Sequence, residues 1–503
     1  MIYYINMSKK RTSAKNYFDY IVLFVLNAAE MILELVAARL LSPYFGSSNF
    51  VWTAIIGIIL LAMSLGNVIG GEIASRKNHR YWAGMLLLFA SIYIAITPVI
   101  NVPILEHIKA GNTGTEWAAI ISSIIFFLIP STILGIITPI IMKERIGDSQ
   151  KKGEESGRIT SISAIGSLVG TFLGGFLLIP ALGTKAIFVL LGAIIIPATI
   201  LFVRGNIPKE KRYKAVYLLT IMATICISAL SIATVISKND AGVISIDTEY
   251  GRIILEEDDG VLYYRQSGAY SSATFLDENR KFELVFDYMK KYDIMFNFLD
   301  AKNTAMIGGA GYQYPKYFIS HFQDKAMDVI EIDPVSTDIA KKYFFLDDLL
   351  KTYGEERIGL YNEDGRVYLS NTDKKYDAIL NDSFSGEVPV GTMATVEAAK
   401  TIRQRLNPGG VYMSNTLGAI SGDKGRFLRS EVKTLGQVFS HVYVVPVKDS
   451  YNPESLVNWM VIATDNNRYQ PENLIEIKYE DADIVLTDDY CPSDSLISTY
   501  YYD

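Results

Sequence analysis

The chain has little cysteine: Cys226 lies in an apolar stretch and Cys491 lies near the C-terminus. Two cysteines can form neither a disulfide framework nor a zinc site, and they do not identify a redox compartment. The second half also lacks positive charge, because residues 237–503 hold 27 Lys and Arg against 43 Asp and Glu. A nucleic-acid-binding protein needs a basic face for phosphate contacts, so we expect no nucleic-acid partner. We also expect no metal site.

The first half has the opposite charge and is largely apolar. Residues 1–236 hold 20 Lys and Arg against 11 Asp and Glu. Crossing a bilayer takes roughly 20 apolar residues, whereas buried helices of a soluble core would be shorter and amphipathic. Glu30 and Glu34 interrupt the first stretch and no small-residue cleavage site follows, so it is not a cleaved signal peptide. We predict a seven-helix membrane domain over 1–236, with the lipid bilayer as partner and crossings near 18–40, 50–71, 82–105, 117–142, 159–180, 183–203 and 215–236.

The orientation of this domain follows from the basic residues in alternate loops. One side receives 17 Lys and Arg and the other receives three, Arg39, Lys109 and Lys185. Because cytoplasmic loops carry the excess of positive charge, we predict a cell-membrane protein with a cytoplasmic N-terminus. An odd number of crossings then places everything after residue 237 outside the cytoplasm.

Glycines and two acids mark particular faces of these helices. Glycines recur every four residues in the fifth and second stretches, which lets helix backbones approach closely in lipid. We expect packing between helices of one chain, with a homo-oligomer through the same faces as the alternative. Glu30 and Glu34 lie one turn apart within an apolar helix, where each uncompensated charge would cost a few kcal/mol. The sequence leaves open a structural ion pair and a substrate or proton site. The glycines are Gly66, Gly70, Gly166, Gly170 and Gly174.

The length of 503 residues suggests two or three domains. Residues 237–274 predict a small β subdomain with strands Val243–Ile246, Gly251–Glu256 and Val261–Gln266, and Asp259-Gly260 forms a hairpin turn. Residues 275–503 begin with an expected helix over Phe282–Asp300 and then alternate strand and helix. This alternation predicts a parallel, doubly wound Rossmann-like sheet. Its strands are expected at Thr304–Ile307, Ala326–Ile332, Arg357–Tyr361, Tyr376–Leu380 and Val411–Ser414.

Ligands on such sheets bind beyond the carboxyl ends of the strands. The first strand runs into Gly308-Gly309-Ala310-Gly311, which permits close approach of a ligand to the backbone. Glu331 ends the second strand and can accept both ribose hydroxyls. Asp364 follows the third strand and could take an adenine amino group, and Asp382 follows the fourth as a general base or an ammonium anchor. The turn lacks the G-x-G-x-x-G spacing and a basic residue, so a nucleoside without phosphates suits this acidic rim better than a dinucleotide.

These residues resemble the spermidine synthase (polyamine aminopropyltransferase) family, specifically its membrane-fused bacterial and archaeal members. The glycine turn is similar to the family's nucleoside-binding turn, Glu331-Ile332-Asp333-Pro334 to its ribose-binding strand end, Asp364-Gly365 to its adenine contact, and Asn381-Asp382-Ser383 to the start of its catalytic loop. The resemblance implies a methyltransferase/spermidine synthase-type fold, decarboxylated S-adenosylmethionine or another S-adenosyl compound as donor, and Asp382 as base. Further similar segments are Glu34–Ser48, Gly157–Gly166, Leu178–Thr184, Leu406–Gly410 and Leu486–Tyr490.

Two positions depart from the family pattern. The family's nucleoside turn usually carries an Asp where this chain has Gly311, followed by Tyr312, and its catalytic loop has a second acid where this chain has Ser385. Each lost charge-assisted bond to an ammonium would remove roughly 1.5–3 kcal/mol. The set of acids that would hold a polyamine is therefore incomplete.

Three functions follow as hypotheses. The first is a membrane-bound transferase acting on an amine or related small acceptor with an S-adenosyl donor. The second is an extracytoplasmic enzyme that modifies a surface or lipid-linked glycan without a nucleoside cofactor, with Asp382 and Asp489 as acid/base pair. The third is a polyamine transporter or sensor in which Glu30 and Glu34 carry the cation. The predicted catalytic residues are Asp382, Asp489, Tyr264 and Tyr270; the cofactor-binding residues are Gly308, Gly309, Gly311, Glu331, Asp333 and Asp364; the substrate-binding residues are Gln266, Tyr312, Ser385 and Tyr490.

Overall fold

A computed structural model describes residues 2–45, 49–111, 114–148, 151–237, 244–266, 269–385, 388–448, 451–468 and 474–497. The chain divides into two compact units. The seven-helix unit comprises Met1–Ala241 with Ile246–Gly251, and the second unit comprises Gly242–Ser245 with Arg252–Asp503. The residues of the predicted subdomain, 237–274, are divided between these two units.

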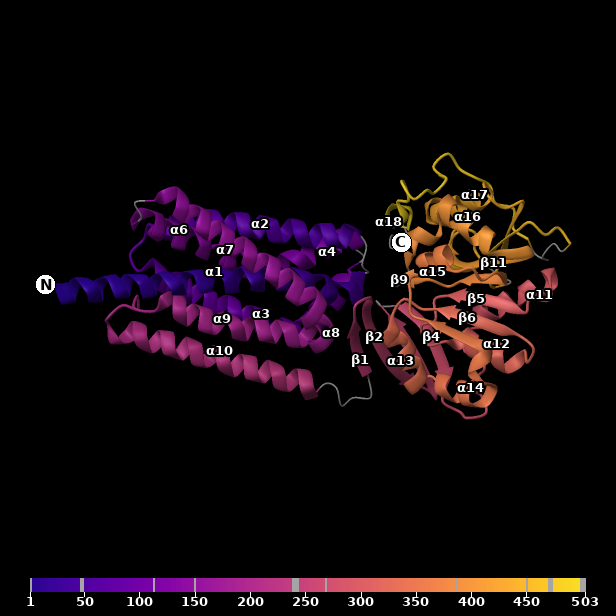
Figure 1. Cartoon of the computed structure of the whole chain (residues 1–503), viewed down its shortest axis with the longest axis horizontal. Helices are drawn as coiled ribbons and strands as arrows, with labels where there is room; N and C mark the ends of the chain where they lie inside the picture. The colour runs from indigo at the N-terminus through magenta and orange to yellow at the C-terminus, as the bar shows by residue number, and fades with distance from the viewer. Residues whose placement is uncertain are drawn as a thin grey trace. The chain divides into compact units, whose positions relative to one another are not determined.

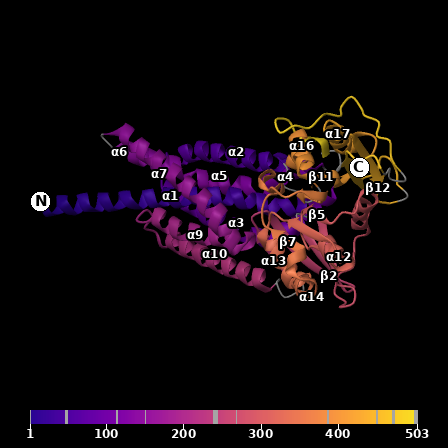
Figure 2. The ribbon, with the colours of Figure 1, turned by 45° about the vertical axis from the view of Figure 1, so that its right-hand side comes forward.

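Within the described ranges, seven helices of the first unit are long and apolar enough to cross a membrane, as the sequence predicts. Figures 1 and 2 both show α3, α9 and α10 running side by side. Two spans contain π-helical turns, which the sequence pattern does not reveal. The elements are α1 (Ile2–Phe45), α2 (Asn49–Ile73), α3 (His79–Ala110), α4 (Thr115–Ser123), η1 (Ile124–Leu128), α5 (Ile129–Gly135), α6 (Ile137–Asp148), α7 (Lys152–Phe172), η2 (Leu173–Leu178), α8 (Ile179–Leu182), α9 (Thr184–Val203) and α10 (Lys211–Ser237).

The repeated glycines pack helices of this chain against one another. A Cβ atom added to Gly166 would lie 2.5 Å from the Phe24 carbonyl oxygen of α1, and one added to Gly170 would lie 2.4 Å from the Ala28 carbonyl oxygen. Gly66 of α2 approaches the Thr132 carbonyl of α5 in the same way. Small residues at such crossings let backbones meet. The faces predicted as an alternative oligomer contact are thus occupied by the chain's own helices.

Buried ion pairs join four helices at one end of this unit. Arg80 of α3 is 8% exposed, and its guanidinium donates to Asp19 of α1 at 2.9 Å and to Glu144 of α6 at 2.8 Å. Arg145 of α6 pairs with Glu155 of α7. Removing one partner of a buried pair leaves an uncompensated charge and typically costs about 3–5 kcal/mol. These pairs therefore hold α1, α3, α6 and α7 together.

We expect Gly170→Ala to destabilise the seven-helix unit by about 1–3 kcal/mol, because the new methyl group overlaps the Ala28 carbonyl of α1. The matched control is Gly57→Ala in α2, where an added Cβ meets no atom within 4 Å. Thermal unfolding of the detergent-solubilised full chain measures both. Equal midpoints for the two variants would contradict the α1–α7 contact.

After the last long helix the chain forms a four-stranded sheet in the order β1-β2-β3-β4, whose residues from Arg252 onward belong to the second unit. The predicted hairpin between β2 and β3 is confirmed, with Asp259 at φ 46° and Gly260 at φ 73°, as a turn with two left-handed residues requires. Sequence reasoning missed the fourth strand. The strands are β1 (Ile244–Thr248), β2 (Gly251–Asp258), β3 (Val261–Gln266) and β4 (Ala269–Phe275).

The main sheet of the described second unit has seven strands in the order β12-β13-β11-β8-β5-β6-β7. Neighbours from β11 to β7 run parallel, whereas β13 is antiparallel to both β11 and β12. The expected all-parallel sheet is thus corrected to a mixed one, because two late strands extend its edge. These strands are β5 (Asn303–Ile307), β6 (Ala326–Ile330), β7 (Ile358–Tyr361), β8 (Tyr376–Asn381), β11 (Leu406–Gly418), β12 (His441–Pro446) and β13 (Val457–Thr464).

One segment of this unit differs from the helix that the sequence predicts. The expected helix over Phe282–Asp300 is a 3-10 helix, η4 (Asp287–Ile294), followed by α11 (Met295–Phe298). Tyr292 and Met295 are buried, so this irregular segment belongs to the core. The other elements are α12 (Gln313–His321), α13 (Pro334–Tyr343), α14 (Leu346–Tyr353), η5 (Glu355–Arg357), α15 (Gly365–Asn371), β9 (Phe384–Ser385), β10 (Val388–Pro389), η6 (Gly391–Met393), α16 (Val396–Arg405), η7 (Asp423–Gly425), α17 (Arg426–Leu435) and α18 (Ser493–Ile497).

Candidate functional site

The carboxyl ends of four adjacent strands lie together, as predicted. Backbone hydrogen bonds continue just beyond the strands: Gly308 N–H donates to the Ile330 carbonyl, Asp382 N–H to the Ile307 carbonyl and Glu331 N–H to the Tyr361 carbonyl, each at 2.9 Å. These bonds fix the first residue after β5, β6 and β8. The glycine turn, Glu331 and Asp382 thus share one edge of the sheet.

The glycine turn is tightly packed. Gly308 has φ 92°, and a Cβ there would lie 2.6 Å from the Asp382 carbonyl oxygen, so only glycine fits. Ala310 (φ 45°) and Tyr312 (φ 56°) also adopt the left-handed region, which is uncommon for residues with a side chain. Such backbone strain clusters at functional sites.

The Glu331 carboxylate holds this turn. Its Oε2 accepts from the backbone N–H groups of Gly309 (2.7 Å) and Ala310 (2.9 Å), and its Oε1 accepts from Asp333 N–H (2.9 Å). Burial raises the pKa of Glu331, while these three donors act in the opposite direction. Because a carboxylate oxygen can take two donors, Oε1 keeps an acceptor position.

Asp382 is held through both carboxylate oxygens. Asn415 Nδ2 donates to Oδ1 at 2.9 Å, and the Tyr288 hydroxyl donates to Oδ2 at 3.0 Å. Burial raises the pKa of Asp382, and the two hydrogen bonds partly offset that rise. A carboxyl group that is oriented in this way and has a raised pKa has the properties of a general base.

Sequence reasoning missed both of these partners. Asn415 directly follows the strand expected at Val411–Ser414, so the rule that located Asp382 could also have located it. Tyr288 lies in η4, within the segment expected to be a regular helix. Nothing in the spacing of that segment indicates that its hydroxyl reaches the edge of the sheet.

Asp364 lies at the end of β7 and begins α15. Its Oδ1 accepts from Val367 N–H at 3.0 Å, so this carboxylate caps the helix. Two apolar side chains that follow strand ends are exposed: Val367, next to this cap, at 45%, and Ile332, just after β6, at 37%. Asp364 and Gly308 are half-buried. This edge thus offers apolar surface and acceptor atoms together.

Several predicted contact residues are buried instead of lining an opening. Tyr264 and Tyr312 are 0% exposed, and their hydroxyls bond to Ser336 at 2.7 Å and to Thr337 at 2.8 Å. Asp333 is 1% exposed and caps α13 through Val335 N–H. Gly311 is buried as well, and a Cβ there would lie 2.7 Å from Ser272 Oγ. In this structure these four residues make packing and hydrogen-bond contacts inside the domain, and the catalytic, substrate-binding and cofactor-binding roles predicted for them stay predictions.

Aromatic rings extend from Asp382. Tyr288 stacks on Phe286 with centroids 6.2 Å apart, Phe286 lies 6.5 Å from Tyr263, and Tyr263 lies 5.3 Å from Tyr270. Tyr270 is 57% exposed. Its predicted place on the acceptor side is therefore open to solvent. Gln266 is half-buried at the end of β3, and the side chain of Ser385 lies outside the described residues.

The segment Leu486–Tyr490 is tied to the domain by Asp488. Its carboxylate accepts from Thr395 Oγ1 at 2.6 Å and from Arg366 at 3.1 Å. Asp489 and Tyr490 are exposed, and no hydrogen bond or ion pair among the described residues joins Asp489 to Asp382. The described residues also contain no group of three or more His, Cys, Asp or Glu side chains that could hold a metal ion.

The order and direction of its strands define a Rossmann-like domain. Residues 283–471 match the family model described as "Spermine/spermidine synthase domain", so the second unit carries a domain of that family. Polyamine aminopropyltransferase 2 of Aquifex aeolicus (strain VF5) is 21% identical over 401 residues, which cover 78% of this chain and 77% of that protein. These relatives are transferases by name.

Two further matches are shorter. The polyamine aminopropyltransferase of Vibrio vulnificus (strain CMCP6) is 30% identical over 141 residues, which cover 27% of this chain and 44% of that protein. The structure titled "a probable spermidine synthase from Corynebacterium glutamicum ATCC 13032" has a TM-score of 0.40 and 22% identity, and covers 46% of this chain and 82% of that one.

We expect the stability of the second unit to rise with pH above about 7 because of Lys316 in α12. Burial lowers the pKa of this lysine to about 7, whereas its pKa in the unfolded chain is about 10.4. Between these values the unfolded state binds more protons, so the free energy of unfolding increases with pH, by at most about 1.4 kcal/mol per unit. Trp459, the one tryptophan in residues 252–503, reports unfolding in a W52F/W82F/W117F background.

The control for this experiment is Lys316→Met. This variant loses hydrogen bonds to Thr274 (2.9 Å) and the Phe344 carbonyl (2.6 Å), so its absolute stability falls. The discriminating quantity is the slope against pH, which should flatten. A slope equal to that of the unsubstituted chain would assign the effect to another group.

Proposed function

We propose that this chain is a membrane-bound transferase whose second unit moves a group from an S-adenosyl-type donor to an amine or related small acceptor. The observation that carries the proposal is the Asp382 carboxylate, oriented by two donors at the edge where the glycine turn and Glu331 also lie. The match of residues 283–471 to a spermine/spermidine synthase domain supports the same reaction class.

The edge of the sheet fits the donor. Glu331 Oε1 keeps an acceptor position for a ribose hydroxyl, and Asp364 lies where an adenine amino group could be recognised. The exposed Ile332 and Val367 side chains would flank the flat base. When bound, the donor would supply a carbon activated by its sulfonium group. We infer decarboxylated S-adenosylmethionine as the simplest such compound.

Asp382 would accept the proton that an attacking amine must lose. Its raised pKa brings the carboxylate closer to the neutral pH at which a base works best. Tyr288 and Asn415 would keep both oxygens in place without neutralising the group. The aromatic rings of Tyr263, Phe286 and Tyr288 would accompany the acceptor, since aromatic faces attract ammonium groups by about 0.5–2 kcal/mol.

We expect Asp382→Asn to lower kcat by about 10²–10⁴-fold, because the amide cannot take up the proton. In the unsubstituted chain, kcat should rise with pH through the pKa of Asp382 as the carboxylate forms, and this rise should vanish in the variant. The assay is transfer from decarboxylated S-adenosylmethionine to a panel of amines, followed by mass spectrometry.

The matched control is Asp489→Asn. The exposed Asp489 has no described contact with Asp382, so transfer should be unaffected. Retained transfer in D382N would remove Asp382 from the chemistry. Loss of activity on a glycan in D489N would instead favour the acid/base alternative.

Donor binding can be measured separately from chemistry. We expect Val367→Asp to weaken binding of decarboxylated S-adenosylmethionine about tenfold or more, because a carboxylate replaces exposed apolar surface at the proposed base-binding edge. Calorimetric titration of the full chain measures the affinity. The control is Glu257→Asp at an exposed position of β2, which should leave the affinity for the donor unchanged. If V367D and the unsubstituted chain bound the donor with equal affinity, the adenine ring would not lie against Val367.

We further propose the topology that the loop charges favour, with the N-terminus cytoplasmic and the second unit outside. In that arrangement an S-adenosyl donor must reach the outer side of the membrane. If no donor is present there, the hypothesis of a glycan-modifying enzyme without a nucleoside cofactor gains support. A cysteine introduced at Asp489 in a C226S/C491S background would react with an impermeant maleimide on intact cells if the second unit is outside. Labelling that requires broken cells would place this unit in the cytoplasm.

A further inference from the structure

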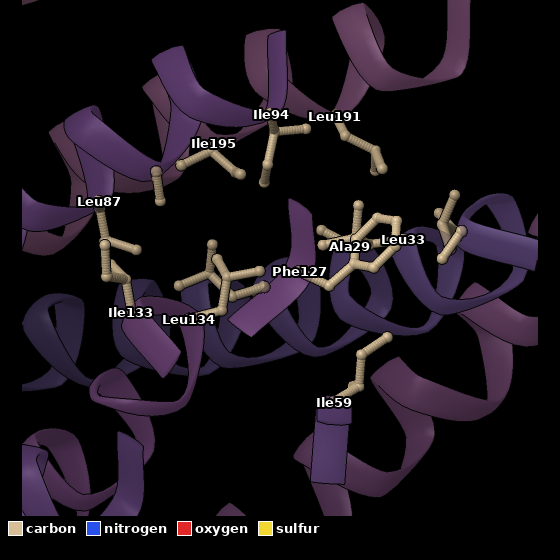
Figure 3. Close-up of a cluster of buried hydrophobic side chains, with 14 of the residues drawn as sticks. Ala29, Leu33, Ile59, Leu87, Ile94, Phe127, Ile133, Leu134, Leu191 and Ile195 are labelled. Atoms are coloured by element: carbon tan, nitrogen blue, oxygen red, sulfur yellow. The ribbon is translucent and has the colours of Figure 1, made fainter. Parts of the chain in front are cut away.

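Glu30 is a buried acid that has no positively charged partner in the described part of the seven-helix unit. Glu30 of α1 is 3% exposed, and among the described residues neither of its carboxylate oxygens has a hydrogen-bond donor. Figure 3 shows the apolar packing around this part of α1, where Ala29 and Leu33 lie beside Phe127 of η1. An ionised carboxylate in such a place would cost several kcal/mol. The group therefore holds a proton or a cation.

The helix facing Glu30 is interrupted. Ser131 of α5 lies close to the Glu30 carboxyl, is 0% exposed, and its hydroxyl also has no partner among the described residues. It directly follows Pro130 and the π-helical turn η1. A proline has no N–H to offer the preceding turn, and π-helical turns occur frequently at functional sites.

Further oxygen atoms flank the same turn. Ser122 and Ser123, immediately before η1, are 0% exposed, and their hydroxyls have no partner in the described structure. The Ile125 carbonyl in η1 accepts a hydrogen bond from the Tyr93 hydroxyl of α3. Interrupted helices of transporters use such free oxygens to coordinate small cations. The span thus has buried, unpartnered hydroxyls on both sides of η1, and Ser131 is the one that acts on Glu30.

The neighbouring charges do not neutralise Glu30. Glu34, one turn further along α1 and half-buried, is the titratable group that acts on it electrostatically. The buried arginines of this unit, Arg80 and Arg145, are paired with Asp19, Glu144 and Glu155. Because two carboxylates one turn apart repel each other when both are ionised, a state in which one of them binds a proton or another cation is favoured.

We propose that Glu30 is the central ligand of an exchangeable cation site within the seven-helix unit. Its class of ligand is a small monovalent cation, for which a proton and a metal cation such as Na⁺ compete. The Ser131 hydroxyl is the second oxygen of the site. This function belongs to the helices and does not depend on the transferase reaction of the second unit.

Dicyclohexylcarbodiimide tests the site, because it adds to a protonated carboxyl group in apolar surroundings and leaves a mass label. The full chain in detergent is treated with the reagent, digested and analysed by peptide mass spectrometry. We expect labelling of Glu30 that falls as pH rises from about 6 to about 9, and that falls at fixed pH when Na⁺ replaces a large organic cation. Both effects measure exchange at one carboxyl group.

The variants separate binding from folding. Glu30→Gln should lose the label at this position, whereas Glu34→Gln should retain labelling at Glu30. Glu30→Asp keeps a carboxyl group and should be labelled if the bundle folds, which covers the case in which E30Q fails to fold. Absence of label at Glu30 in the folded chain, or labelling that responds to neither pH nor Na⁺, would overturn the proposal.

Discussion

The candidate site depends on the contact between two chain segments at the end of β5. Gly308 approaches the Asp382 carbonyl so closely that a side chain would overlap it. The Asp382 N–H in turn bonds to the Ile307 carbonyl, which precedes that glycine. The turn that would receive a nucleoside and the loop that carries the base are therefore one rigid junction, and a shift in either one moves the other.

Glu331 extends this junction to the next strand. Three backbone N–H groups converge on its carboxylate, two of them from the glycine turn. The carboxylate thus satisfies two backbone N–H groups of the strained turn that leads into α12. The sequence pattern predicts Glu331 as a ribose acceptor but does not reveal that its carboxylate also holds the glycine turn. A substitution at Glu331 would therefore change the turn as well as any bond to a donor.

The order of strand ends could be predicted, because glycine, acid and turn residues follow short apolar strands at regular intervals. Seven membrane-length helices could also be predicted, from hydrophobic length alone. Side-chain direction could not. Tyr264 and Tyr312 have the composition of pocket residues, yet Ser336 and Thr337 satisfy their hydroxyls in the core. Tyr288 reaches Asp382 from a 3-10 helix whose position depends on packing that local pattern does not encode.

The segment around Asp483–Tyr490 returns to cover α16 and α17. Asp483 forms a fully buried ion pair with Arg429 at 2.8 Å, and Leu486, 0% exposed, donates its N–H to Thr434. These residues lie beyond the matched family domain, which ends at 471. During translation, Arg429 stays without its counter-charge until about fifty more residues have been added. The core around α17 is therefore incomplete until this late segment has joined it.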